Sequence, residues 1–279
     1  MLATGIAILF SAAQTSAALI AEDSFLIGGD ASSGEYTVGG VGGQNPTTTG
    51  FTGAWNNVSD DLEIVSSGLT YSNGGGVMQT SGGALKAEAD GVRVARTFST
   101  VLDGSSTGTY YLGFLYQQAD TSEGFRGITL YNGSPGSSNR DFMFRPDSAT
   151  AGQWNIDAFG NDQTNVAPSN SDVNFILMKF DMSSSAASDS LSVYLNPDLA
   201  TEPSSGAIYS AGSLDIAFDR MGMERYVPST GEKDRDIWMD EIRLGDSYES
   251  VTTIPEPGSL ALVTAGIVAA LGLRRFRRG

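Results

Sequence analysis

The sequence predicts an all-β fold, an antiparallel jelly-roll sandwich lying between two apolar chain ends. Three observations support this fold class. Several short segments alternate between apolar and polar residues, as strands do. The composition includes 35 Gly and only 9 Pro among 279 residues, which suits many tight turns because Gly adopts positive φ freely. The middle of the chain has no long stretch of helix-forming residues.

The strand prediction comes from individual segments. The expected strands span residues 92–98, 110–116, 127–131, 140–145, 174–180, 191–195 and 237–244. Segment 127–131 runs into Asn132-Gly133, a tight-turn pair, so we expect a hairpin with 140–145. Segments 174–180 and 191–195 form a second expected antiparallel pair, with Phe175, Leu177 and Val193 largely buried. Segment 110–116 is apolar on both faces, as an inner strand would be.

The N-terminus has the pattern of a secretion signal. Residues 1–18 are uncharged, and an apolar run is followed by the small residues Ser16-Ala17-Ala18. No Lys or Arg precedes the apolar run, so an N-terminal core strand is the alternative. We therefore expect a signal peptide with a signal helix over 1–18 and one domain over 19–253, since no linker or repeat divides that stretch.

The C-terminus, residues 254–279, combines three features. Pro255-Glu256-Pro257 is followed by an apolar run of about 16 residues, roughly 24 Å long as a helix. Four arginines then close the chain: Arg274, Arg275, Arg277 and Arg278. Basic residues stay on the cytoplasmic side of a membrane, so this pattern predicts a transmembrane helix with the body outside.

The triplet, the apolar span and the basic end together resemble the PEP-CTERM sorting signal of Gram-negative bacteria. The resemblance covers about the last 25 residues and implies a partner, an exosortase-type transpeptidase that removes the tail. Pro255, Glu256 and Pro257 would be its recognition residues. The protein would then be exported to the cell surface or the extracellular space, held by the membrane before tail removal. A plain tail anchor is the alternative.

Composition excludes several function classes. The chain has no Cys and no His, which rules out Ser-His-Asp and Cys-His catalysis and thiolate metal sites. An enzyme of this composition would depend on carboxylates, Tyr, Lys or a hard metal such as calcium. The net charge is −16, from 16 basic and 32 acidic residues, and a chain this acidic repels nucleic acid.

A second resemblance concerns the body of the chain. Residues 191–198 with Glu202-Pro203, and residues 238–251, resemble the late strands of concanavalin A-like, laminin G-like jelly-roll domains. The Gly-rich residues 39–43 and residues 50–55 fit the opening of such domains. The resemblance implies the fold but not the ligand, because this fold serves both binding proteins and enzymes.

Three acidic residues at the last expected strand invite a catalytic interpretation: Asp236, Asp240 and Glu241. Strict alternation would put Asp240 on one face with Trp238, Ile242 and Leu244, and Glu241 and Arg243 on the other. Adjacent strand residues cannot form a facing acid/base pair. We therefore expect Asp240 to be a hydrogen-bond acceptor for a neighbouring loop, and Glu241 and Arg243 to be solvated.

Two kinds of binding residue remain. Aromatic rings in or near predicted loops could stack on a sugar, with core packing as the alternative: Trp55, Trp154, Tyr131 and Tyr226. Surface acids could bind calcium, although no EF-hand loop is present: Asp60, Asp61, Asp120 and Glu123. No other cofactor is expected.

These observations favour a non-catalytic surface protein acting in adhesion, glycan contact or matrix structure, with extracellular polysaccharide as a candidate partner. The alternative is a polysaccharide-degrading hydrolase or lyase that uses carboxylate, Tyr or Lys chemistry.

Overall fold

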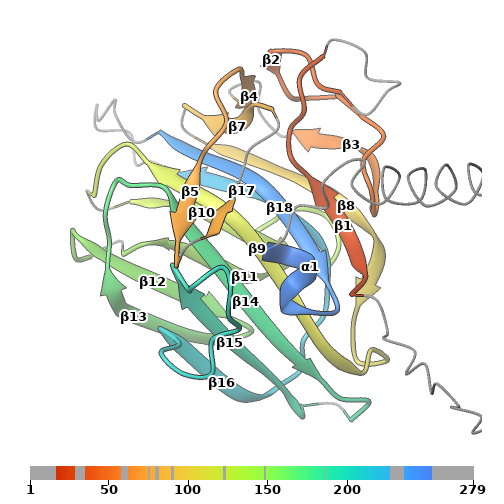
Figure 1. Cartoon of the computed structure of the whole chain (residues 1–279), viewed down its shortest axis with the longest axis vertical. Helices are drawn as coiled ribbons and strands as arrows, with labels where there is room; N and C mark the ends of the chain where they lie inside the picture. Colours follow the sequence, from red (N-terminus) through yellow and green to blue (C-terminus); the bar gives the residue numbers. More distant parts are fainter. Residues whose placement is uncertain are drawn as a thin grey trace, which may run out of the picture.

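Two antiparallel sheets pack face to face in the computed structural model (Figure 1). The structure describes residues 17–28, 35–57, 62–74, 76–78, 82–88, 91–121, 124–147, 149–185, 187–226 and 236–252. The expected signal peptide, apart from its last two residues, and the sorting tail from residue 254 lie outside these ranges. Within them, no helix is long and apolar enough to cross a membrane.

The larger sheet has nine strands in the order β16-β15-β14-β9-β18-β7-β4-β2, with β1 paired to β18. Its strands are β1 (Leu19–Asp23), β2 (Gly39–Gly40), β4 (Leu62–Val65), β7 (Ala84–Ala87), β9 (Gly108–Gln118), β14 (Asn174–Met182), β15 (Asp189–Leu195), β16 (Tyr209–Leu214) and β18 (Ile237–Gly245).

The smaller sheet has seven strands in the order β13-β12-β11-β10-β17-β8-β3. Its strands are β3 (Phe51–Asn57), β8 (Val92–Leu102), β10 (Phe125–Tyr131), β11 (Arg140–Pro146), β12 (Gln153–Ala158), β13 (Asn161–Pro168) and β17 (Phe218–Tyr226). A separate ribbon pairs β5 (Tyr71–Asn73) with β6 (Gly76–Met78), and one short helix, α1, spans Tyr248–Thr252.

The predicted antiparallel sandwich is confirmed. Each of the seven expected segments forms a strand, and both expected hairpins pair as predicted, β10 with β11 and β14 with β15. Phe175, Leu177 and Val193 are fully buried. Period-2 alternation therefore located the strands well, because each strand has at least one face in a core.

The nine-stranded sheet is covered on both faces. Its inner face and that of the seven-stranded sheet enclose the main core. Its outer face packs under α1 and the β5–β6 ribbon, which lie in front of the sheet in Figure 1. Tyr248 and Val251 of α1 join Leu115 and Phe175 in this second core. Strand β9 is apolar on both faces because it contributes to both cores.

A bulge in β18 reverses the expected alternation. The pairing of β18 with β9 shifts between Asp240 and Arg243, and Glu241 has a φ of 50°. The extra residue turns the following side chains to the opposite face. Ile242 lies in the main core, whereas Trp238 packs beside the second core, so the expected shared face is wrong.

The expectation that Glu241 and Arg243 are solvated is also wrong. Both residues are 1% exposed, and Arg243 Nη2 lies 2.6 Å from Glu241 Oε2. The expected role of Asp240 is confirmed. Its carboxylate accepts hydrogen bonds from the backbone N–H of Leu69, at 2.8 Å, and of Glu241, at 2.7 Å.

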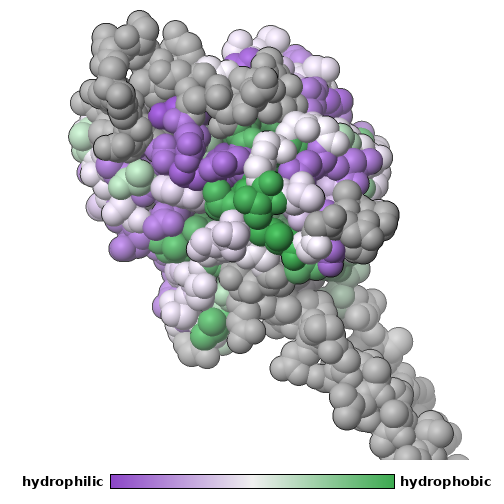
Figure 2. Space-filling view, turned by 90° about the horizontal axis from the view of Figure 1, so that it is seen from above, coloured by the Kyte–Doolittle hydropathy of each residue, from purple (hydrophilic) through white to green (hydrophobic). Residues whose placement is uncertain are grey.

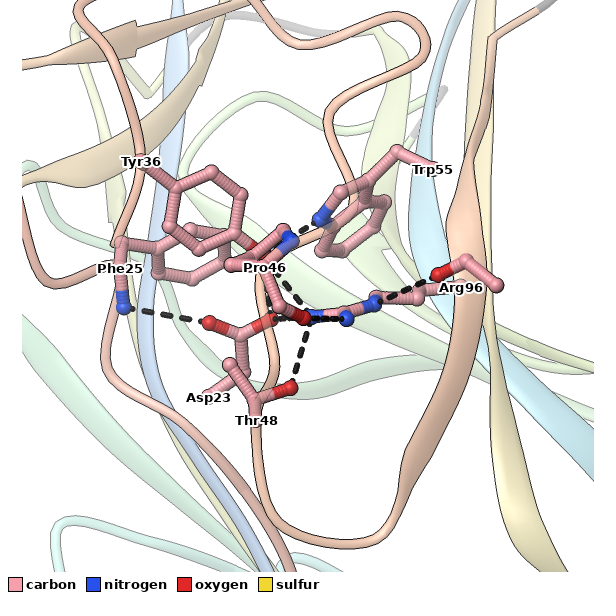
Figure 3. A network of polar contacts seen from close by, with 8 residues as sticks. Asp23, Phe25, Tyr36, Pro46, Thr48, Trp55 and Arg96 are labelled. Carbon is pink, nitrogen blue, oxygen red and sulfur yellow. Dashed lines mark hydrogen bonds and ion pairs between the residues drawn. The ribbon is translucent and has the colours of Figure 1, made fainter. Parts of the chain in front are cut away.

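A buried polar network ties the two sheets together at β1 (Figure 3). Arg96 of β8 points between the sheets, and its Nη1 lies 2.8 Å from Asp23 Oδ2 of β1. Arg96 also donates to the carbonyl of Pro46 at 2.5 Å and to Thr48 Oγ1 at 2.8 Å. Tyr36 donates to Asp23 at 2.6 Å and accepts from the Trp55 indole at 2.7 Å. The guanidinium of Arg96 thus connects β8 of the smaller sheet to β1 of the larger sheet and to the loop that contains Pro46 and Thr48.

On the side that Figure 2 shows, hydrophilic residues surround a group of hydrophobic residues near the centre, and smaller hydrophobic areas lie elsewhere on this face. Four large apolar side chains of the described residues are exposed: Leu26, Val38, Val77 and Val101. Single exposed apolar side chains are common on protein surfaces.

Candidate ligand-binding site

The outer face of the seven-stranded sheet carries charged side chains instead of a second hydrophobic core. In β8, Val94 belongs to the main core, so its neighbour Arg93 points to the outer face. Arg93 pairs in register with Glu224 of β17. In β11, Phe144 belongs to the core and Arg145 points outward by the same alternation. Four adjacent strands, β11, β10, β17 and β8, therefore bring distant charges onto one face.

Three arginines form the arginine cluster of this face: Arg93, Arg140 and Arg145. Glu224 lies between two of them, with Oε1 2.5 Å from Arg93 Nη2 and Oε2 3.3 Å from Arg140 Nη1. Tyr131 donates its hydroxyl hydrogen to Glu224 Oε2 at 3.2 Å. Arg140 Nη2 also lies 3.7 Å from Asp157 Oδ2. Arg93 and Arg140 are therefore both neutralised by ion pairs.

The ring of Phe125 contacts two guanidinium groups. Its centroid lies 4.7 Å from Cζ of Arg140 and 5.1 Å from Cζ of Arg145. A guanidinium near an aromatic face is attracted by the ring quadrupole. Phe125 thus holds the two planar groups close together despite their like charge.

Arg145 differs from the other two arginines because it has no ion pair within the described part of the chain. It is 7% exposed, and its Nη1 donates to the carbonyl of Pro146 at 3.2 Å. Its Nε has no hydrogen-bond partner. Burial lowers the pKa of its guanidinium, while the negative charges of Asp162, Asp147 and Asp157 raise it. An arginine stays charged at any physiological pH, so this site holds an incompletely paired buried cation.

Other polar atoms on this face also lack partners. They are Nε of Arg93, Nε of Arg140, Oγ1 of Thr129 and Oδ1 of Asn155. Buried polar atoms in folded proteins are normally satisfied by protein, water or ligand. This set contains both donors and acceptors, and all of these atoms are buried.

Three of the four rings expected to stack on sugars lie inside the protein, and the expectation is corrected for these three. Trp55 is 2% exposed, and Trp154 and Tyr131 are 0% exposed. Trp154 packs against Phe144, with ring centroids 4.7 Å apart. A ring enclosed on both sides offers no face to a ligand. Tyr226 ends β17, and its side chain lies outside the description.

Of the four acids considered for calcium, the structure describes only Asp120. Asp120 Oδ1 lies 2.7 Å from Arg126 Nη2, and Asp60, Asp61 and Glu123 lie outside the described ranges. The described residues contain no group of three or more acidic side chains placed to hold a metal ion. The calcium expectation therefore rests on the sequence alone.

The carboxylates of β18 do not face one another across an open site. Asp236 lies 3.2 Å from Lys86 Nζ. Asp240 is 0% exposed, and its pKa is raised well above 3.8, first by burial and then by the negative charge of Glu241. Its two oxygens are used by backbone N–H groups, so its role is structural.

No family model and no curated protein matches this chain. Solved structures with a similar fold include an endo-β-1,4-glucuronan lyase from the fungus Trichoderma reesei, with 11% identity, a TM-score of 0.39 and coverage of 67% of this chain and 92% of that chain. A carbohydrate esterase from the Shiga toxin-encoding bacteriophage phi24B has 10% identity, a TM-score of 0.43 and coverage of 68% and 89%.

The ligand-binding domain of botulinum neurotoxin serotype D, solved with N-acetylneuraminic acid, has 9% identity and a TM-score of 0.40. The match covers 68% of this chain and 45% of that one. Similarities this distant indicate only the sandwich fold and do not indicate the function.

Proposed function

We propose that this is an exported, non-catalytic β-sandwich protein that binds an acidic polysaccharide through the arginine cluster. Its place of action would be the cell surface or the extracellular matrix. The export part of the proposal rests on the signal-like residues 1–18 and on the tail 254–279, which an exosortase-type transpeptidase would process.

The observation that carries the binding proposal is the incomplete pairing of Arg145. A guanidinium matches a carboxylate in a planar, two-bond geometry, and such charge-assisted bonds are strong. The carboxylate of a uronic acid residue would give Arg145 the direct ion pair that it lacks among the described residues, in competition with the nearby charges of Asp147, Asp157 and Asp162.

The overall charge makes this site selective. The chain has a net charge of −16, so its surface as a whole repels a polyanion. Binding of an acidic polymer would therefore depend on a few positioned arginine side chains and not on a generally basic surface. The arginine cluster supplies such side chains.

The chemistry of the cluster supports binding more than catalysis. Glu224, the carboxylate at its centre, is held between two arginines. Burial, followed by the nearby charge of Glu224, raises the pKa of Tyr131, so its phenol stays protonated near neutral pH. A protonated phenol and a doubly paired carboxylate are poor general bases.

A glycan array tests the proposal. The body of the protein, residues 19–253, is applied to immobilised uronic acid polymers and to neutral polymers of the same length. We expect binding to the acidic polymers that weakens as salt increases. Binding to neutral polymers alone, or to neither class, would contradict the acidic-polysaccharide proposal.

The hydrolase or lyase alternative is favoured by one observation. Glu224 and Asp157 both approach Arg140, at 3.3 Å and 3.7 Å, so two carboxylates lie near one another on this face. Release of new chain ends from a uronic acid polymer would support this alternative if Glu224→Gln abolished it with the fold intact. We expect no such release.

A further inference from the structure

A pocket lies on the outer face of the opposite, nine-stranded sheet. It has a volume of about 370 Å³. Its wall includes the partly exposed ring of Trp238, the amide of Gln117 and the hydroxyls of Ser67 and Thr70. A volume of this size falls in the range of small-molecule sites, roughly 300 to 1,000 Å³.

The alternation of β18 directs Trp238 toward this pocket. Its neighbours Ile237 and Met239 belong to the main core, so Trp238 points away from that core and remains partly exposed. The carboxylate of Asp240, beside the pocket, holds the backbone N–H of Leu69 at 2.8 Å. Leu69 belongs to the 67–70 segment that forms the opposite wall. The ring and the loop are thus fixed by the same short stretch of strand.

The charges around the pocket do not favour an anion. Lys86 lines the pocket, and its Nζ lies 5.5 Å from the centroid of the Trp238 ring. Its positive charge is neutralised, because its ammonium group pairs with Glu88 and lies 3.2 Å from Asp236. Two carboxylates and one ammonium group leave a local excess of one negative charge. An acidic sugar would be repelled here.

We propose that this pocket binds a neutral sugar ring, stacked on Trp238. The indole supplies a flat apolar surface for the C–H face of a pyranose. Gln117 donates through Nε2 to the carbonyl of Ser171 at 3.1 Å, which fixes the amide and leaves its oxygen to accept from a sugar hydroxyl. Ser67 and Thr70 are exposed and offer further hydroxyl partners.

The two sites face away from each other, since they lie on the outer faces of the two packed sheets. One protein molecule could therefore hold an acidic chain on one side and a neutral chain on the other. The second site makes the protein a bridge between two kinds of polysaccharide.

Tryptophan fluorescence of the full-length chain tests this site. Trp55 and Trp154 are buried, so a ligand in the pocket would change mainly the emission of Trp238. The probes are neutral oligosaccharides of glucose, galactose and mannose. We expect a saturable change with at least one probe, a loss of at least about tenfold in affinity for Trp238→Ala, and a smaller loss for Gln117→Ala.

Because Trp238 also packs on the second core, circular dichroism checks the fold of Trp238→Ala, and Gln117→Ala provides an independent test if that variant unfolds. Binding measured by calorimetry should be unchanged in Arg145→Gln, which separates this site from the arginine cluster. The absence of a saturable change with every probe, or unchanged binding in Gln117→Ala, would overturn the proposal. Either result would leave the acidic-polysaccharide site standing.

Discussion

Replacing Arg96 by Met is expected to be one of the most destabilising single changes in this fold. Arg96 is 1% exposed and Asp23, its ion-pair partner, is 0% exposed. The substitution preserves much of the side-chain volume but removes every polar contact shown in Figure 3 for the guanidinium. Among the described residues, it leaves the buried carboxylate of Asp23 with the hydroxyl of Tyr36 and the N–H of Phe25 as its donors.

The expected loss of folding stability follows from the polar groups that lose Arg96 as their partner. Removing one partner of a buried ion pair costs about 3–5 kcal/mol, mainly because the remaining charge stays buried. The carbonyls of Pro46 and Gly53 also lose a donor. Burial already raises the pKa of Asp23, and Arg96 opposes that rise. Without Arg96 the carboxyl will take up a proton more readily, which keeps the cost within this range rather than above it.

Urea unfolding followed by circular dichroism measures this cost. With a slope of about 2–3 kcal/mol/M, the midpoint should fall by roughly 1–2.5 M. The matched control is Arg220→Met on the neighbouring strand β17, where a partly exposed arginine lies 3.3 Å from Asp219. That change should cost about 1 kcal/mol or less. Equal losses of stability in the two variants would contradict the claim that the network around Arg96 stabilises the packing of the two sheets.

The remaining predictions concern Asp240 and the tail. The raised pKa of Asp240 means that its contribution to stability is complete below the unfolded value near 3.8 and is lost as pH rises through the folded pKa. Asp240→Asn should therefore cost roughly 1 to 3 kcal/mol at low pH, because one acceptor oxygen is lost, and the cost should shrink toward neutral pH. Urea titrations at pH 4 and pH 7 measure the difference, and a cost that stays constant with pH would show that Asp240 does not titrate in this range. Replacing Pro255, Glu256 and Pro257 by Ala should leave export intact and make the full-length, membrane-associated form accumulate, as seen by cell fractionation and immunoblotting. Normal processing of that variant would exclude the triplet as the sorting signal.

The strands of this fold were predictable because alternation is a local property. Each strand contributes apolar side chains to a core at every second position, so segments such as 174–180 were recognisable without knowledge of their neighbours. The bulge at Glu241 was not predictable in this way. A single inserted residue with positive φ reverses the faces without leaving a composition signal, since Glu is not a residue that favours this conformation.

The arginine cluster could be predicted only in part. Alternation alone would have placed Arg93 and Arg145 on the polar faces of their strands. Their proximity depends on the strand order β11-β10-β17-β8, which joins segments more than 70 residues apart in the sequence. Sequence patterns do not define that order. The sequence likewise does not show which tryptophans are buried, because the burial of Trp55 and the partial exposure of Trp238 both follow from tertiary packing.

The most direct test of the account is calorimetric titration of a soluble uronic acid oligosaccharide into the wild-type protein and into Arg145→Gln. The glutamine keeps a polar side chain but removes the buried charge. Loss of a charge-assisted contact should weaken binding roughly tenfold to a hundredfold. Lys179→Gln, which removes one positive charge from the opposite sheet, is the control and should bind like the wild type. Equal affinities for wild type and Arg145→Gln would contradict the assignment of the arginine cluster as the acidic-polysaccharide site.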